Sequence, residues 1–291
     1  MIKIVDKNTA FNEIRPIKIN NKLIDFSTPL IMGILNITPD SFYDGGKYKD
    51  NLSLLKKTEE MIEGGADIID IGAVSTRPGA PDISVDEELK RIIDPLALLT
   101  KSFPKTIFSI DTYRSKVANE TIAAGAHIIN DISGGTMDTN MFSTIAKLKV
   151  PYILMHIHGT PQSMQKSPIT NNVVSVIREF FQSRIEQLSR LGADNIILDP
   201  GLGFGKSLEC NYKLLKNIGN VRVNNLPILA GISRKSMINK VLNIIPEKAL
   251  TGTIALNTIA LLSGANILRV HDVKEATEVV RIMEFIKKVE C

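Results

Sequence analysis

Two segments of the sequence place polar side chains where a buried strand would end, although packing alone does not require polarity there. Residues 32–42 read MGILNITPDSF and residues 198–206 read LDPGLGFGK, so an apolar run leads to Asn36 in the first and to Asp199 in the second. Loops that follow strands in α/β proteins commonly carry binding and catalytic residues. Both segments are therefore candidates for a ligand site.

Polar residues follow other short apolar runs in the same way. The residues at or just after these runs are Asn36, Asp111, Asn130, Asp131, His156, Asp199, Ser233, Arg234, Lys235, Arg269 and His271, and residues 75–79 (STRPG) follow one further run. If the strands form a parallel barrel, these ends meet at one face, where that fold places active sites. Arg269 and His271 are two residues apart, so they are expected to point to the same side of their strand.

The polar groups divide into two chemical sets. The first set suits a flat polar heterocycle and consists of Asp111, Asn130, Asp199 and Lys235. A carboxylate can accept two hydrogen bonds from adjacent N–H and NH2 groups, and a lysine can donate to a ring nitrogen and a carbonyl oxygen. The second set suits a phosphate site and consists of Asn36, Arg269 and His271. Arginine and histidine donate to anionic oxygens, and the amide oxygen of asparagine can bind a Mg²⁺ ion that phosphates also hold.

Each of these residues also has a structural interpretation. Asp111 and Asp131 could cap the helices that follow them, and residues 130–135 could be turn chemistry alone. Arg269 could form a structural ion pair, and His271 could be an ordinary packed or surface histidine. The sequence lacks residues that three other motifs require. These motifs are a phosphate-binding P-loop, a dinucleotide fingerprint and a zinc site at His156 and His158. All the structural interpretations would have to hold together at one end of the fold, which favours the functional one.

Hydrophobic periodicity predicts the strands and helices on which these residues lie. Eight apolar runs, each too short for a helix, predict buried parallel strands at residues 30–35, 68–71, 106–110, 127–129, 152–155, 195–198, 227–230 and 266–270. Segments of helical period predict helices at residues 51–63, 84–101, 114–124, 173–191, 247–262 and 274–288, the second opening with a capping box at Ser84. This alternation predicts a single α/β domain, a (β/α)8 TIM barrel. An open doubly wound sheet is the structural alternative.

The first 28 residues precede this pattern. Residues 2–5 and 14–19 are expected to pair as a β-hairpin that plugs the barrel floor, so residues 1–28 form an extension and residues 29–291 the barrel. The net charge of +4 is not concentrated in basic runs, so nucleic acid is not an expected partner. The two separated cysteines indicate free thiols, and neither a signal-peptide pattern nor a membrane-spanning apolar stretch occurs. The expected location is the cytoplasm.

Along nearly its whole length the chain resembles the dihydropteroate synthase family. The matching motifs lie at residues 32–42, 75–80, 109–113, 129–135, 155–156, 159–161, 198–206, 231–236 and 269–273. The resemblance implies a TIM-barrel transferase of folate biosynthesis and a target of sulfonamides. It joins 6-hydroxymethyl-7,8-dihydropterin diphosphate to 4-aminobenzoate and releases pyrophosphate. It further implies a homodimer and Mg²⁺ as the cofactor.

The resemblance also assigns roles to single positions. It implies pterin contacts from Asp111, Asn130, Met155, Asp199 and Lys235, a 4-aminobenzoate pocket bordered by Thr76, Pro78, Phe204 and Ser236, Mg²⁺ on Asn36, and the diphosphate on Arg269 and His271. Asp111, Asn36, Lys235, Arg269 and His271 are the implied catalytic residues. The loops at residues 37–47 and 74–83 are expected to close over the site. Val74 departs from the family pattern, in which this position is often glutamate.

Two other functions share part of this pattern. A pterin-binding methyltransferase domain would use the same barrel and the same pterin-holding positions, but it has no reason to keep the motifs at residues 38–42 and 75–78. A non-catalytic pterin-binding homologue has no need of a diphosphate site at Asn36, Arg269 and His271. Both alternatives are therefore weaker than the synthase interpretation.

Overall fold

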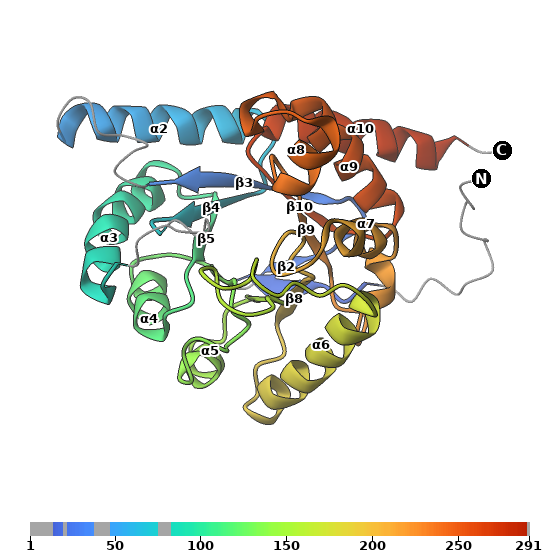
Figure 1. Ribbon diagram of the computed structural model, residues 1–291. Helices are drawn as coiled ribbons and strands as arrows, with labels where there is room; N and C mark the ends of the chain where they lie inside the picture. Colours follow the sequence, from blue (N-terminus) through green and yellow to red (C-terminus); the bar gives the residue numbers. More distant parts are fainter. Residues whose placement is uncertain (1–13, 20–21, 38–46, 75–82, 290–291) are drawn as a thin grey trace.

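The computed structural model describes residues 14–19, 22–37, 47–74 and 83–289 (Figure 1). Its centre is a sheet of eight parallel strands in the order β8-β7-β6-β5-β4-β3-β10-β9. These strands are β3 (Leu30–Asn36), β4 (Ile68–Gly72), β5 (Ile107–Asp111), β6 (Ile128–Asp131), β7 (Tyr152–Met155), β8 (Ile196–Asp199), β9 (Leu229–Gly231) and β10 (Ile267–Val270). The two edge strands meet because the backbone N–H of Leu198 donates to the carbonyl of Pro227 at 2.9 Å. The predicted barrel is confirmed, and the open sheet is wrong.

The helices lie outside the barrel, as Figure 1 shows. They are α2 (Lys47–Glu63), α3 (Val85–Ser102), α4 (Ser115–Ala123), α5 (Met141–Leu148), α6 (Val173–Arg190), α7 (Leu208–Lys216), α8 (Ser236–Leu242), α9 (Leu250–Leu262) and α10 (Val273–Lys288), with 3-10 turns at Ile218–Val221 and Pro246–Lys248. The Ser84 side chain accepts a hydrogen bond from the N–H of Glu87, which confirms the predicted cap of α3. The sequence pattern missed α5, α7 and α8, which are short helices of 8, 9 and 7 residues.

Alternation along the strands divides the barrel interior into two layers. Inward residues near the start of the strands are apolar and pack together as one cluster: Met32, Ile68, Ile128, Ile153, Ile197, Leu229 and Ile267. Because side chains alternate across a strand, the next inward residue lies two positions later. Those positions hold Asp70, Asn130, Met155, Asp199 and Arg269 among others. An apolar floor therefore lies directly beneath a polar layer.

A β-hairpin closes the bottom of this floor. Strand β1 (Ile17–Ile19) pairs antiparallel with β2 (Lys22–Ile24), and Ile17, Ile19 and Phe26 join the apolar cluster at the strand starts. The predicted plug is present, and among the described residues the partner of Ile17–Ile19 is β2, which follows it in sequence. The predicted pairing with residues 2–5 stays a prediction. Residues 2–5 lie outside the described residues. The boundary between residues 28 and 29 stays a prediction.

Two further predictions concern the environment of the protein. Cys210 is a buried free thiol, whereas Cys291 is not among the described residues. Of the helices in the described part of the chain, none is long and apolar enough to cross a membrane.

Candidate active site

A charged cluster occupies the polar layer beside the barrel axis. Arg269 on β10 donates from Nε to Asp70 Oδ2 at 2.7 Å and from Nη2 to Asp111 Oδ2 at 2.8 Å. Nη2 also lies 2.7 Å from Asp70 Oδ2, so it contacts both carboxylates. Asn130 on β6 donates from Nδ2 to the same oxygen of Asp70 at 3.0 Å. The side chain of Asp70 is 0% exposed, whereas those of Asp111 and Arg269 are 15% and 19% exposed. Asp70 is therefore the buried base of the cluster, and the other two charges reach toward solvent.

The charge state of Asp111 is finely balanced in this cluster. Burial raises the pKa of Asp111 to about 7, against the lowering effect of Arg269 and with the help of the negative charges of Asp70, Glu88 and Asp131. A carboxyl with a pKa near neutrality can be present as either acid or carboxylate at physiological pH. Such perturbed groups are typical of functional sites.

Asp199 and Lys235 form a second group in the same layer. Asp199 Oδ1 accepts from the N–H of Gly201 at 2.7 Å, and Lys235 Nζ donates to the carbonyl of Leu202 and lies 4.5 Å from the centre of the Phe204 ring. Burial raises the pKa of Asp199, an effect that the Lys235 charge opposes, and burial lowers the pKa of Lys235 to about 8. Each group therefore favours the charged state of the other.

The glycine-rich loop after β8 is held in place by two buried side chains. Lys206 Nζ donates to the carbonyls of Gly201 at 2.7 Å, Phe204 at 3.0 Å and His156 at 3.3 Å. Asn211 accepts from the N–H of Gly203 at 2.6 Å and donates to the carbonyl of Lys206 at 3.0 Å. These bonds fix the Leu202 carbonyl and the Phe204 ring that contact Lys235.

Glycine is required in this loop for steric reasons. Gly201 and Gly205 have φ angles of +65° and +68°. A Cβ at Gly201 would overlap the carbonyl oxygen of His156, and one at Gly205 would overlap that of His158. Only glycine avoids both the left-handed strain and these contacts.

Asn36 lies at the mouth of the barrel. It is the last residue of β3 and is exposed. Gly72 lies opposite it on β4, and a Cβ there would be 3.6 Å from both Asn36 Oδ1 and Asp111 Cβ. Because Gly72 has no side chain, the space between Asn36 and Asp111 is not filled.

His271 lies just beyond the end of β10. Its backbone N–H donates to Ser233 Oγ at 3.2 Å, and its ring Nδ1 shares a hydrogen bond with the same hydroxyl at 3.0 Å. Burial lowers the pKa of His271 to about 4, with further lowering by Arg269 and Arg234. The imidazole is therefore neutral near pH 7 and available as a hydrogen-bond donor.

The structure does not bring every polar strand-end residue into this cluster. Asp131 faces away from it: Oδ2 accepts from Tyr152 at 2.6 Å and from the N–H of Gly135 at 2.8 Å, so its role is structural. His156 packs edge-on against Phe180, with ring centres 5.0 Å apart, and burial lowers its pKa to about 2. Arg234 forms an ion pair with Asp272.

The remaining predicted residues lie around the mouth or outside the described part. Met155 is buried in a small apolar cluster against which Phe204 packs, and Ser236 is exposed at the start of α8. Thr76 and Pro78 lie outside the described residues, as do residues 38–46 and 75–82 of the two predicted lid loops.

The structure adds three residues that the sequence analysis did not select: Asp70, Lys206 and Asn211. Asp70 had a recognisable signal, because a charge in the middle of the run IIDIG contradicts the apolar character of a strand covered on both faces. Lys206 ends the motif at residues 198–206 but had no role assigned to it, and Asn211 carried no signal.

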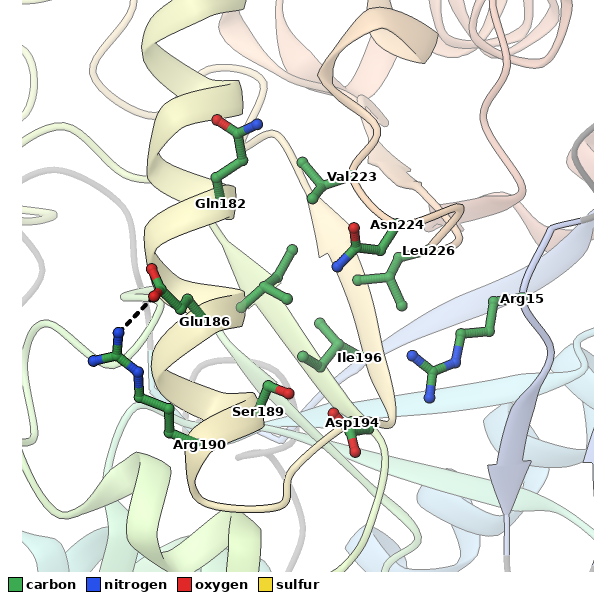
Figure 2. A pocket seen from close by; sticks show the side chains of 11 residues that line it. Arg15, Gln182, Glu186, Ser189, Arg190, Asp194, Ile196, Val223, Asn224 and Leu226 are labelled. Carbon is green, nitrogen blue, oxygen red and sulfur yellow. Dashed lines mark hydrogen bonds and ion pairs between the residues drawn. The ribbon is translucent and has the colours of Figure 1, made fainter.

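A separate pocket of about 530 Å³ lies at the other end of the barrel (Figure 2). It is bordered by the C-terminal half of α6 and by residues that precede β8 and β9, including Asp194 and Leu226. Ion-paired Glu186 and Arg190 stand at its rim. It is distant in the fold from the strand ends that carry the charged cluster, so the chemistry does not reside there.

Comparison with known proteins places the chain in a family. The sequence model of a family described as pterin binding enzyme matches residues 32–271. The dihydropteroate synthase of Escherichia coli K12 is 43% identical over 263 residues, which cover 90% of this chain and 93% of that protein. The Synechocystis dihydropteroate synthase is 40% identical over 92% of this chain and 94% of that protein.

Solved structures give the same result. A Yersinia pestis dihydropteroate synthase in complex with a sulfonamide drug superposes with a TM-score of 0.88 at 40% identity, covering 94% of this chain and all of that one. The Burkholderia cenocepacia dihydropteroate synthase complexed with 7,8-dihydropteroate gives 0.84 at 35% identity, covering 94% and 97%.

The barrel, its polar layer and the family match define a pterin-binding enzyme. The chain belongs to the dihydropteroate synthase family. The predicted function as a transferase of folate synthesis is thereby confirmed.

Proposed function

We propose that the described strand-end residues carry the condensation of 6-hydroxymethyl-7,8-dihydropterin diphosphate with 4-aminobenzoate. The observation that carries this assignment is one hydrogen-bonded cluster, in which Arg269 joins Asp111 to Asp70 and Asp70 accepts from Asn130. In this proposal the pterin is bound by Asp111, Asn130, Met155, Asp199 and Lys235, and 4-aminobenzoate by Thr76, Pro78, Phe204 and Ser236.

The pterin side follows from hydrogen-bonding capacity. One carboxylate oxygen of Asp199 accepts a hydrogen bond from the N–H of Gly201, so the second oxygen is available to an N–H or NH2 group of the heterocycle. Lys235 has three donors, and one is used by the Leu202 carbonyl. The Phe204 ring beside this ammonium supplies an apolar wall near the second substrate.

The donor set at Asn36 fits Mg²⁺ that is held mainly by its substrate. The described residues contain no group of three or more His, Cys, Asp or Glu that could hold a metal by themselves. Mg²⁺ commonly takes one or two protein oxygens and completes its octahedron with phosphates and water. Asn36 would supply the protein oxygen, and bound Mg²⁺ would neutralise charge on the departing diphosphate.

Arg269 and Asp111 exchange partners when substrate enters. Arg269 Nη2, which now contacts both Asp70 and Asp111, turns to the diphosphate oxygens, while Nε stays on Asp70. The bond between the pterin methylene carbon and the diphosphate oxygen breaks, and its electron pair leaves with pyrophosphate toward Arg269 and neutral His271. The freed carboxylate of Asp111 stabilises the cationic pterin methylene. The amino nitrogen of 4-aminobenzoate then bonds to that carbon and loses a proton to solvent.

The test of this function is pyrophosphate release from the dihydropterin diphosphate with Mg²⁺, with and without 4-aminobenzoate. Release that requires 4-aminobenzoate and yields dihydropteroate supports the synthase. Tight pterin binding without product would instead support the methyltransferase or binding-only alternatives.

The pH dependence of the reaction is expected to report Asp111. Because its pKa is raised to about 7, the carboxylate is present above that pH and is lost below it. We therefore expect kcat/KM for the dihydropterin diphosphate to fall about tenfold per pH unit below pH 7. Steady-state rates across that range measure this fall of kcat/KM at acid pH, the acid limb of the pH profile. The residual activity of Asp111→Asn should show no acid limb. An unchanged acid limb in that variant would exclude Asp111 as the titrating group.

An exposed apolar face suggests how two copies associate as a homodimer. On α10 and just after it, Ile282, Phe285, Ile286 and Val289 are 57–69% exposed and recur at helical spacing. Exposed Ile259 and Leu262 lie on α9, which packs against α10, and exposed Val241 and Leu242 lie on α8, which packs against α9. Such patches commonly mark interfaces, and a twofold interface uses the same patch on both copies.

Phe285→Asp is therefore expected to convert the dimer to a monomer at micromolar concentration. Losing an aromatic anchor of about 2 kcal/mol or more raises the dissociation constant at least about 30-fold. Light scattering after gel filtration measures the mass. Leu23→Asp is the matched control, since Leu23 is 70% exposed on the hairpin instead. Equal masses for the two variants would place the interface elsewhere.

A further inference from the structure

The Asp70 carboxylate is the most deeply buried charge of the polar layer. It lies in the middle of β4, between Ile69 and Ile71, and its side chain is 0% exposed. Burying a carboxylate is costly unless charge and hydrogen bonds compensate it. An apolar residue would serve β4 better if packing were its only task. The retained charge therefore indicates a task in the site above it.

The contacts of Asp70 join the two halves of the site. One oxygen, Oδ2, accepts from both Arg269 Nε and Asn130 Nδ2, at 2.7 and 3.0 Å. Arg269 is on the proposed diphosphate side, and Asn130 is on the proposed pterin side. One atom thus sets the distance between the groups that bind the two ends of the same substrate.

Asp70 also differs from Asp111 in its exposure and in its expected response to substrate. The Asp111 side chain is partly exposed, and in the proposed reaction it gives up Arg269 to the diphosphate, whereas the Asp70 side chain is fully covered by its neighbours. Nη2 of the guanidinium contacts both carboxylates, so it can leave Asp111 for the diphosphate while Nε keeps its hydrogen bond to Asp70. Asp70 is therefore the fixed point about which Arg269 acts.

We propose that Asp70 is a positioning residue that holds Arg269 and Asn130 in register for the dihydropterin diphosphate without touching it. This inference rests on the proposed function of the site. Asp70 is then expected to affect the binding and reaction of the dihydropterin diphosphate and not the binding of 4-aminobenzoate.

The variant that tests this is Asp70→Asn, which keeps the shape and removes the charge. We expect kcat/KM for the dihydropterin diphosphate to fall about 100-fold, the scale of a 1 Å misplacement, with the KM for 4-aminobenzoate unchanged. The negative charge of Asp70 helps to raise the pKa of Asp111, so the acid limb of the pH profile should move to lower pH. A residue that only stabilised the fold would move neither the substrate preference nor the pH limb.

Ser109→Ala is the matched control at the same level of the barrel. Ser109 is the β5 residue in register with Asp70 and is also fully buried, but its hydroxyl has no hydrogen-bond partner among the described atoms. We expect wild-type rates and pH profile from it. If Asp70→Asn behaves like Ser109→Ala while the wild type makes dihydropteroate, the positioning role is wrong. A wild type that makes no dihydropteroate overturns the proposed function instead.

Calorimetry of hydroxymethyl-dihydropterin and of pyrophosphate separates positioning from misfolding. A partly unfolded variant shows a reduced binding stoichiometry, whereas loss of positioning raises both dissociation constants at full stoichiometry. If Asp70→Asn does not fold, a crystal structure of the wild type with dihydropterin diphosphate decides. Retention of the Arg269 Nε contact with Asp70 after Nη2 leaves Asp111 supports the proposal, and departure of the whole guanidinium from Asp70 overturns it.

Discussion

Asp199→Asn is expected to weaken binding of the dihydropterin diphosphate roughly 100-fold, the scale of removing one partner of a buried charge pair. Asparagine can still accept from the N–H of Gly201, so the loop start keeps its anchor. It cannot compensate the charge of Lys235, and it offers an NH2 donor where the heterocycle needs an acceptor. Isothermal titration with the dihydropterin diphosphate measures the loss, and unchanged affinity would remove Asp199 from the pterin site.

Asp131→Asn is the matched control for this experiment. Asp131 is also a buried aspartate at the end of a barrel strand, but its oxygens face Tyr152 and the N–H groups of Ser133 and Gly135. Weakening these bonds should lower the free energy of unfolding by about 1–3 kcal/mol and leave pterin affinity intact. A parallel loss of affinity in both variants would mean that general destabilisation explains the Asp199 result.

Arg269→Lys is expected to lower kcat roughly 100- to 1000-fold, as removal of a preorganised donor to a developing anion does. Lysine keeps the positive charge, so Asp70 is not left without a cation. A single ammonium group cannot hold Asp70 and reach a leaving pyrophosphate at once, which the guanidinium can do with Nε and Nη2. Single-turnover rates with saturating substrates isolate the chemical step.

Arg222→Lys provides the control for the same chemical change. Arg222 donates to the carbonyls of Leu226 and Gly264, both at 2.6 Å, and to Asn266 at 3.0 Å, all near the start of the strands. The Arg222→Lys variant should be less stable than the wild type but keep its single-turnover rate. A wild-type rate in Arg269→Lys would show that charge alone suffices at position 269.

The barrel and much of its site could be predicted from sequence because strands impose a simple rule. Each predicted run lies within a residue or two of an observed strand, and Asn36, Asp111 and Asp199 are the last residues of β3, β5 and β8. In a closed parallel barrel all these ends share one face. The grouping of Asp111, Asn130 and Arg269 therefore needed only strand order and direction.

The remaining features depend on geometry that the sequence does not encode locally. Asp70 and Arg269 are 199 positions apart, and the pairing of the last strand, β10, with β3 brings β4 and β10 to either side of β3. Asp131 and Asp111 look alike at the ends of their strands, but one turns outward to Tyr152 and the other inward. The pleat of the strand decides whether a side chain at its end points inward or outward. A shift of one residue along the strand reverses that direction.

Within the described residues, the apolar plug closes the barrel at the strand starts. Ile17, Ile19 and Phe26 of the hairpin segment pack with the first inward residues of the strands, so the described part of the polar layer opens to solvent at the strand ends. Substrates and products must then use the same opening in opposite directions. A compound lodged at that opening would hinder product departure as well as substrate arrival, so its inhibition would show in turnover even when the deeper subsite is already filled.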